Sequence, residues 1–284
     1  MPPGAEVGID LQSYRVGPEF KGIAGIPLGR LHLVTYGTGQ GLKQGFWLRF
    51  TRPREVCVKC WDPAQEELVE EGTGLPEGSM GSLLAALQRG ELNRHLGAYP
   101  EAEQGRLWRN LTNCVEEGTL ARCGLKLGQR VLAGEWEEEK LPRAGLGAGP
   151  HDGAVVPYFA GLGRAAQFTD VPGARKPGHR AMTPEELTRY HLDRSERLGV
   201  LLSGAYGGGA GAWRGLLGEY QLAFVLFLNL YSMAGLRHWK EATALLCHCG
   251  AQALGEHMEL FAAFVRVLFT QVRGLGLWVW WVCT

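Results

Sequence analysis

The sequence has no excess of positive charge. Its 284 residues include 29 lysines and arginines and 29 aspartates and glutamates, so the formal net charge is zero. No block of basic residues stands out from this balance. Proteins that bind nucleic acids through phosphates gain affinity from lysine and arginine side chains that release counterions. We therefore expect no direct binding to nucleic acid.

Signals for secretion and membrane insertion are also missing. The first residues, MPPGAEVGID, contain no basic segment followed by an apolar run. The seven cysteines are scattered and odd in number, which favours a reducing cytosol or nucleus over an extracellular disulfide framework. The apolar end of the chain, residues 272–284, is too short to cross a bilayer. We expect no membrane anchor.

The motifs of common enzymes and metal sites are missing as well. Cys57 and Cys60 are three apart in a predicted strand, where they point to opposite faces and cannot bind the same ion. Residues 247–249 (CHC) fall on a predicted helix, where neighbouring side chains diverge, so core cysteines are favoured over zinc ligands. The glycine-rich segment 207–211 has no preceding strand and no following Gly-Lys-Ser/Thr. The sequence predicts no catalytic residue, no metal and no cofactor.

What the sequence does contain is a strong helical pattern over residues 218–250, GEYQLAFVLFLNLYSMAGLRHWKEATALLCHCG. Apolar side chains nearly encircle Tyr220 to Tyr231, which predicts a helix buried on most sides. A short turn at Ser232–Gly235 leads to an amphipathic helix that has Trp239 and Leu246 on its apolar side. We expect Phe224, Phe227 and Leu246 to be core residues.

A third helix completes this part of the chain. It is indicated by five apolar residues at helical spacing: Leu254, Met258, Phe261, Val265 and Leu268. Three helices joined by short turns predict a bundle. A capping box over Thr183–Glu186, with Pro184 at the first helical position, predicts the start of the helical domain.

The N-terminal part has a different pattern. Leu31–Tyr36, Gly45–Phe50 and Glu55–Asp62 are rich in aromatic and β-branched residues and predict an antiparallel meander with one buried face. Helices are expected over Ser82–Leu96 and Glu101–Glu117, the second packing against the sheet through residues that include Trp108 and Leu111.

The predicted fold class is α+β, with an N-terminal β-sandwich-like domain with packed helices followed by a C-terminal all-α bundle. The expected divisions are a β-rich domain over 1–124, a Gly/Pro-rich linker or loosely packed region over 125–181, a helical bundle over 182–271 and a divergent tail over 272–284.

Two long motifs carry a family resemblance. GAEVGIDLQSYRVGPEFKGIAGIPLGRLHLVTY, which starts at Gly4, is similar to the pattern GxEFGIDxxxWxVGPxFxGxxxIPPGxHFxxY. Residues 218–247 resemble GELxFAFVxFLxxxxxxxxxHWKxLxxLLC. Both patterns belong to the cistron-splicing factor family, and the resemblance covers roughly residues 4–123 and 165–271. Val7 and Tyr14 stand where the family has Phe and Trp.

The resemblance implies a function. Members of this family are non-enzymatic assembly chaperones of the U5 small nuclear ribonucleoprotein (U5 snRNP), which bind the large scaffold protein of the spliceosome and delay the docking of a helicase. It implies this scaffold protein as partner and a location in cytoplasm and nucleus, and we expect a monomer. Tyr231, His238 and Trp239 are the candidate partner-binding residues, although His238 and Trp239 are equally compatible with buried positions.

The alternative function is a cytosolic enzyme whose site is assembled from dispersed residues such as Asp10, His32 and His95. The resemblance also implies that the chain is shortened at both ends, because family members carry a further strand before Met1 and a further helical segment after Gln271. Gln-Val-Arg-Gly, residues 271–274, is what an exon end read into a splice-donor sequence would encode. We therefore hypothesise that residues 272–284 are translated intron and that apolar bundle surface is left exposed.

Overall fold

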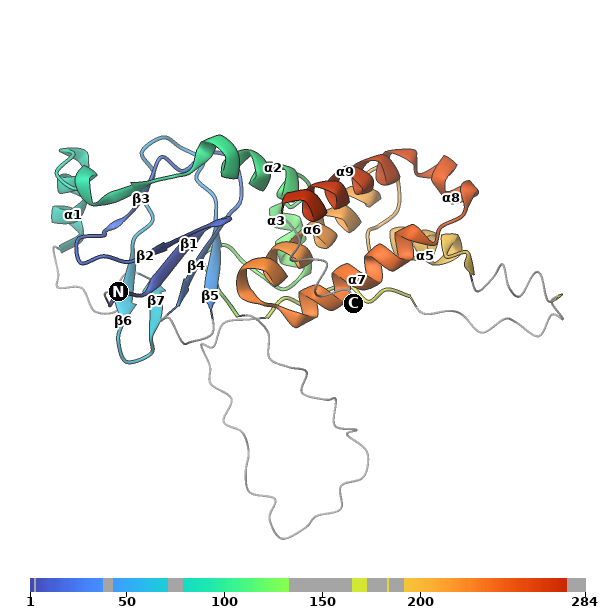
Figure 1. Ribbon diagram of the computed structural model, residues 1–284, viewed down its shortest axis with the longest axis horizontal. Helices are drawn as coiled ribbons and strands as arrows, with labels where there is room; N and C mark the ends of the chain where they lie inside the picture. Colours follow the sequence, from blue (N-terminus) through green and yellow to red (C-terminus); the bar gives the residue numbers. More distant parts are fainter. Residues whose placement is uncertain are drawn as a thin grey trace, which may run out of the picture.

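The structure is a computed structural model that describes residues 1–2, 4–37, 43–70, 79–132, 165–172, 183 and 192–274. A β-rich N-terminal part lies beside a helical C-terminal part (Figure 1). This arrangement confirms the predicted α+β class. Within the described ranges no helix combines the length and the apolar character needed to cross a membrane.

The N-terminal part is built around a five-stranded antiparallel sheet with strand order β2-β1-β4-β5-β9. Its strands are β1 (Glu6–Ile9), β2 (Gln12–Arg15), β4 (His32–Gly37), β5 (Gln44–Leu48) and β9 (Arg130–Leu132). Two small sheets flank it: β3 (Gly22–Ala24) pairs with β8 (Leu96–Ala98), and β6 (Lys59–Asp62) pairs with β7 (Glu67–Glu70). The strand predicted from Glu55 begins only at Lys59, and Cys57 lies before it, exposed.

Both faces of the sheet are covered, so the expectation of one buried face was wrong. On one face, Phe46 and Tyr36 pack with Trp61 of the β6–β7 hairpin. On the other, the rings of Trp47 and Trp108 lie 6.0 Å apart, and the indole N–H of Trp108 donates to the carbonyl of Leu31 at 2.9 Å. Because Phe46 and Trp47 are consecutive, their side chains point to opposite faces, and each face receives a large apolar group.

The helices of the N-terminal part are shorter than predicted. They are α1 (Ser79–Gln88), α2 (Arg106–Thr112) and α3 (Glu117–Arg122), with the short turns η1 (Asn93–His95) and η2 (Glu101–Gly105). The first predicted helix ends near Gly90, whose φ of 74° is a conformation that favours glycine. The second begins as the π-turn η2, and its α-helical part stops at Thr112. Trp108 and Leu111 are buried as expected.

The helical part contains α5 (Ser195–Gly204), α6 (Ala212–Leu230), α7 (Met233–Cys247), α8 (Ala251–Glu256) and α9 (Met258–Gly274). Helix α6 is central, and all of its residues from Leu216 to Leu226 are buried. Phe224 and Leu246 are core residues as predicted. Phe227 is only half-buried: it packs against the edge of the core, and its neighbours Leu228 and Asn229 are half-buried as well.

The end of the chain differs from the predicted pattern in two ways. The expected third helix is interrupted at His257 and forms α8 and α9. Residues 272–274, assigned to the divergent tail, continue α9, while residues 275–284 lie outside the described residues. Most of the capping box expected over Thr183–Glu186 also lies outside them.

The two parts share one hydrophobic core. A single cluster of buried residues runs from Leu31 and Trp47 of the sheet region to Phe264 and Val267 of α9. Helix α6 comes so close to the end of α2 that a Cβ atom at Gly218 would collide with the carbonyl oxygen of Cys114. The predicted division into domains stays a prediction.

Candidate protein-binding site

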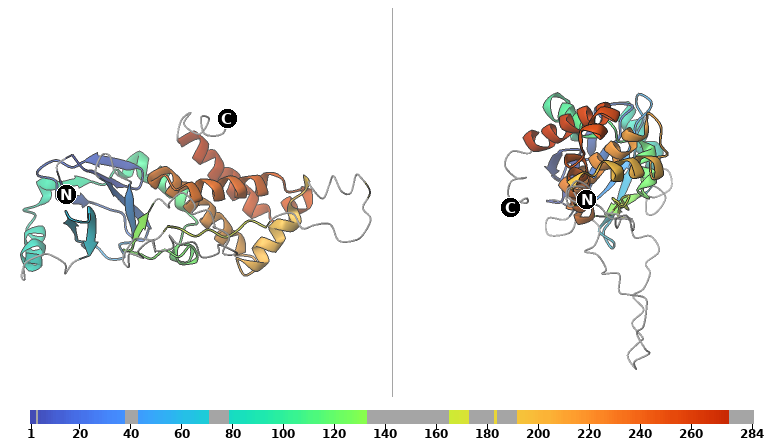
Figure 2. Two further views of the ribbon diagram at one scale, coloured as in Figure 1. Left: turned by 90° about the horizontal axis from the view of Figure 1, so that it is seen from below. Right: turned by 90° about the vertical axis from the view of Figure 1, so that its right-hand side faces the viewer.

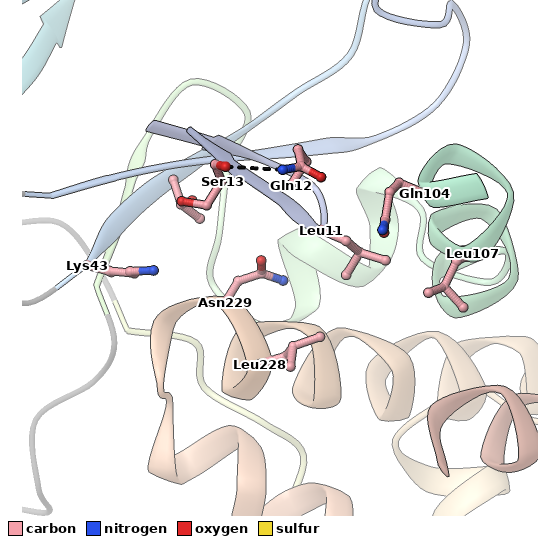
Figure 3. Close-up of a pocket in the computed structure, with 9 residues that line it drawn as sticks. Leu11, Gln12, Ser13, Lys43, Gln104, Leu107, Leu228 and Asn229 are labelled. Atoms are coloured by element: carbon pink, nitrogen blue, oxygen red, sulfur yellow. Dashed lines mark hydrogen bonds between the residues drawn. The ribbon is translucent and has the colours of Figure 1, made fainter. Parts of the chain in front are cut away.

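The described residues form a cavity of about 360 Å³ between the sheet and the end of α6 (Figure 3). Side chains from the β1–β2 hairpin, the α2 region and α6 reach into it from opposite sides. The lining residues are Leu11, Gln12, Ser13, Thr35, Lys43, Gln104, Leu107, Leu228 and Asn229. The cavity thus joins the β-rich and the helical parts of the chain.

The chemistry of the lining suits a peptide segment. Gln12, Gln104 and Asn229 each carry an amide with two N–H donors and an acceptor oxygen, which matches the groups of a peptide backbone. The Gln12 amide now donates to the carbonyl of Ser13 at 3.2 Å. Ser13 lies on β2, which pairs only with β1 in the described part of the chain and is therefore an edge strand. An edge strand can accept an extended segment of another protein.

Tyr231 marks the rim of this region. It ends α6 with a φ of 58°, the left-handed conformation, and its side chain is 61% exposed. The ammonium group of Lys43 lies 5.9 Å from the centre of the Tyr231 ring and 3.3 Å from a carboxylate oxygen of Glu6. A non-glycine residue in this conformation is strained, so the turn holds an exposed aromatic ring at a cost in stability.

The turn that carries Tyr231 is held by close contacts. The hydroxyl of Ser232 accepts from the backbone N–H of Gly235 at 3.1 Å and caps α7. A Cβ atom at Gly235 would lie 2.5 Å from the carbonyl oxygen of Ala223, so α7 starts in close contact with α6. These contacts hold the backbone that follows Tyr231 against α6.

The other two predicted partner-binding residues are buried. The ring of His238 stacks on Phe168 with 4.9 Å between centroids, and burial lowers the pKa of His238. Trp239 packs against Tyr220 and donates its indole N–H to the side-chain oxygen of Gln271 on α9 at 3.0 Å. The structure therefore places only Tyr231 where another protein can touch it without rearrangement.

A buried carboxylate holds part of the predicted linker in place. Glu219 of α6 is fully buried and accepts from both the backbone N–H and the hydroxyl of Thr169 and, at 2.8 Å, from the hydroxyl of Tyr206. The backbone of Gln167 donates to Cys123 at 3.0 Å. Residues 165–172, which we name the strap, are thus bonded to α3 and α6, and β9 is a second ordered element inside the predicted linker.

The residues of the alternative enzyme site are only partly brought together. The carboxylate of Asp10 lies 2.7 Å from Nδ1 of His32 and accepts from the Tyr99 hydroxyl at 2.6 Å and the Leu33 backbone at 3.0 Å. His95 is elsewhere, 3.4 Å from Glu19. Asp10 and His32 are buried, and Nε2 of His32 is 3.0 Å from the carbonyl of Pro27. Every ring nitrogen and carboxylate oxygen of this pair has a protein partner, which is the arrangement of a structural network.

The cysteine pairs weighed as metal ligands do not form a site in the described residues, where no group of three or more histidine, cysteine or acidic side chains could hold a metal ion. Cys247 was expected in the core, but it is exposed at the end of α7. Cys249 is half-buried, and its thiol donates to the carbonyl of Leu245 at 3.3 Å.

Comparison with known proteins shows which family this chain belongs to. The model of the AAR2 N-terminal domain matches residues 1–124, and the model of the AAR2 C-terminal repeat region matches residues 168–278. The "Protein AAR2 homolog" of Mus musculus is 30% identical over 296 residues, which cover 96% of this chain and 73% of the mouse protein. The chain belongs to the AAR2 family. The homolog of Homo sapiens is also 30% identical, and that of Caenorhabditis elegans is 29% identical over 76% of its length. This is the splicing-factor family whose motifs the sequence resembles.

The cavity lies at the junction of the two AAR2 regions. Leu11 to Leu107 of its lining belong to the N-terminal region, and Leu228 and Asn229 belong to the C-terminal region. Sequence reasoning missed the cavity because its lining comes from separate segments that no spacing rule connects. Tyr231 left one signal in the sequence, an aromatic residue at the end of an apolar helical run.

Proposed function

We propose that this AAR2-family chain is a non-enzymatic pre-mRNA splicing factor, an assembly chaperone of the U5 snRNP that binds the large spliceosomal scaffold protein and delays helicase docking. Family membership across 96% of the chain carries this proposal. The junction cavity, the edge strand β2 and the exposed Tyr231 ring supply a surface suited to a protein partner. The balanced charge gives little basis for RNA binding, and we place the protein in cytoplasm and nucleus.

Affinity capture tests the proposal. The purified full chain is immobilised and incubated with cytoplasmic or nuclear extract, and the bound scaffold protein is quantified by mass spectrometry. We expect enrichment of the scaffold protein that Tyr231→Ala or Lys43→Ala reduces at least severalfold, because both side chains lie at the junction. Val200→Ala, an exposed change on α5, is the matched control and should leave capture unchanged. A folded chain that captures no scaffold protein from either extract contradicts the proposal.

RNA binding supplies an independent check. We expect fluorescence anisotropy to show no tight binding of single-stranded RNA by the full chain. A submicromolar affinity that falls steeply with added salt would show phosphate contacts that the neutral charge balance does not provide, and the proposed function would then need revision.

A further inference from the structure

Helix α9 is apolar on two sides. One side, with Leu260, Phe264 and Val267, packs into the shared core. A second set of apolar residues faces solvent: Met258 (70% exposed), Val265 (60%), Phe269 (60%) and Val272 (45%). Ala262 is exposed between them. In both views of Figure 2 the end of α9 projects from the body of the molecule. Within the described residues, the guanidinium of Arg273 lies 5.6 Å from the centre of the Phe269 ring, at the edge of this side.

These five exposed residues form a continuous seam. Met258, Ala262, Val265, Phe269 and Val272 alternate in steps of four and three along α9. This is the spacing by which two helices pack at a shallow crossing angle. The seam extends for about 21 Å, as a rise of 1.5 Å per residue requires. Isolated apolar residues are common on protein surfaces, whereas a contiguous apolar seam marks an interaction surface.

The seam is complementary to itself in the antiparallel direction. With Val265 opposite its own copy, the small Ala262 faces the large Phe269 of the second copy, and Met258 faces Val272. The flank carries opposite charges near one another: Glu259 is six residues before Val265 and Arg273 is eight residues after it, so Glu259 lies within about 3 Å of the level of Arg273 of the second copy. Among the described residues neither Glu259 nor Arg273 takes part in an ion pair within the chain.

We propose that two copies of this chain associate through α9, antiparallel, around a twofold axis near Val265. Such an interface is isologous, so every contact occurs twice. It consists of one helix pair, and the two Arg266 side chains meet near the axis, so association is weak, with a dissociation constant in the micromolar range. The expected monomer is then the form at low concentration. This inference does not depend on the proposed function.

Sedimentation equilibrium over increasing protein concentration tests the proposal. We expect a reversible monomer–dimer equilibrium in the full chain. Val265→Glu places two carboxylates against each other at the axis and should abolish the dimer, whereas Val200→Glu, on the exposed side of α5, should not. Val265 is exposed, so circular dichroism should show both variants folded. A chain that stays monomeric at the highest soluble concentration overturns the proposal, even if another protein is found to bind the seam.

Charge reversal and cross-linking test the geometry. Glu259→Arg or Arg273→Glu alone should weaken the dimer by about tenfold, since each change removes two symmetric ion pairs, and the double variant should restore it. A short bismaleimide should link Val265→Cys chains in a background with Cys57, Cys247 and Cys283 changed to serine, and should not link Val200→Cys chains. Equal linking at both positions, or a double variant no better than the single ones, overturns the antiparallel arrangement.

Discussion

Replacing Tyr231 by glycine and by alanine separates the strain of the turn from the contacts of the ring. The φ of 58° costs an L-residue about 1–2 kcal/mol relative to glycine. Both substitutions lose the contact between Lys43 and the ring, which contributes about 0.5–1 kcal/mol at an exposed site. Only glycine relieves the strain. Its greater freedom in the unfolded chain offsets about 0.4–1 kcal/mol of that gain.

We therefore expect Tyr231→Gly to be about 1 kcal/mol more stable than Tyr231→Ala, from the balance of these terms. Urea unfolding, followed by circular dichroism, gives the difference in free energy of unfolding from the midpoints of the two variants. The comparison requires that both variants have the same slope of free energy against urea concentration. Val200 in α5 is the control, because at this helical position Gly should instead be about 1 kcal/mol less stable than Ala. If glycine is the less stable substitution at both positions, the turn does not store the strain inferred here.

Three further predictions concern buried polar groups. Glu219→Ala leaves the donors of Thr169 and Tyr206 without an acceptor. At about 1–3 kcal/mol for each unpaired group, it should lower the free energy of unfolding by about 3 kcal/mol or more in urea titrations; a loss below about 1 kcal/mol would contradict the role given to the strap. Trp239→Phe leaves the buried Gln271 oxygen unpaired and should cost about 1–3 kcal/mol in the same assay, and an unchanged midpoint would refute this. Burial lowers the pKa of His238 below its unfolded value of 6.5, so the unfolded chain takes up this proton first as the pH falls. The contribution of neutral His238 to stability is therefore present above about pH 6.5 and is lost at lower pH. His238→Phe should reduce the loss of stability between pH 7 and 5, and an unaltered pH profile would show that other groups cause this loss.

Patterns that depend on one helix or strand were predictable from the sequence. The nearly all-apolar run in α6 required burial on most sides, and the structure buries it. The same reasoning was wrong for Phe227, which is half-buried, because periodicity does not show how completely each turn of a core helix is covered by its neighbours. It also could not show which of the two apolar sides of α9 is buried in the core. Met258 and Val265 have the same spacing as a core stripe, yet they face solvent.

Features that join distant segments were not predictable. Thr169 lies in a part of the chain that is rich in glycine and proline. Nothing in the sequence pattern there indicated that Glu219, 50 residues later, would accept hydrogen bonds from it. The contact of Asp10 with Tyr99 spans 89 residues. Such pairs follow from the packing of the whole chain, so a single sequence lists the groups without showing which of them meet.

The core shared by the two AAR2 regions has a consequence for dissecting the protein. The contacts of α6 with α2 and α3, including the amide of Gln221, which accepts from Cys114 at 2.8 Å and donates to Asn113 at 2.7 Å, cross the boundary between the matched regions. A cut near Gly124 would separate Gln221 from both Cys114 and Asn113 and would divide the buried cluster that the two regions share. We therefore expect each matched region to be less stable alone than within the whole chain, because each would lose buried contacts with the other.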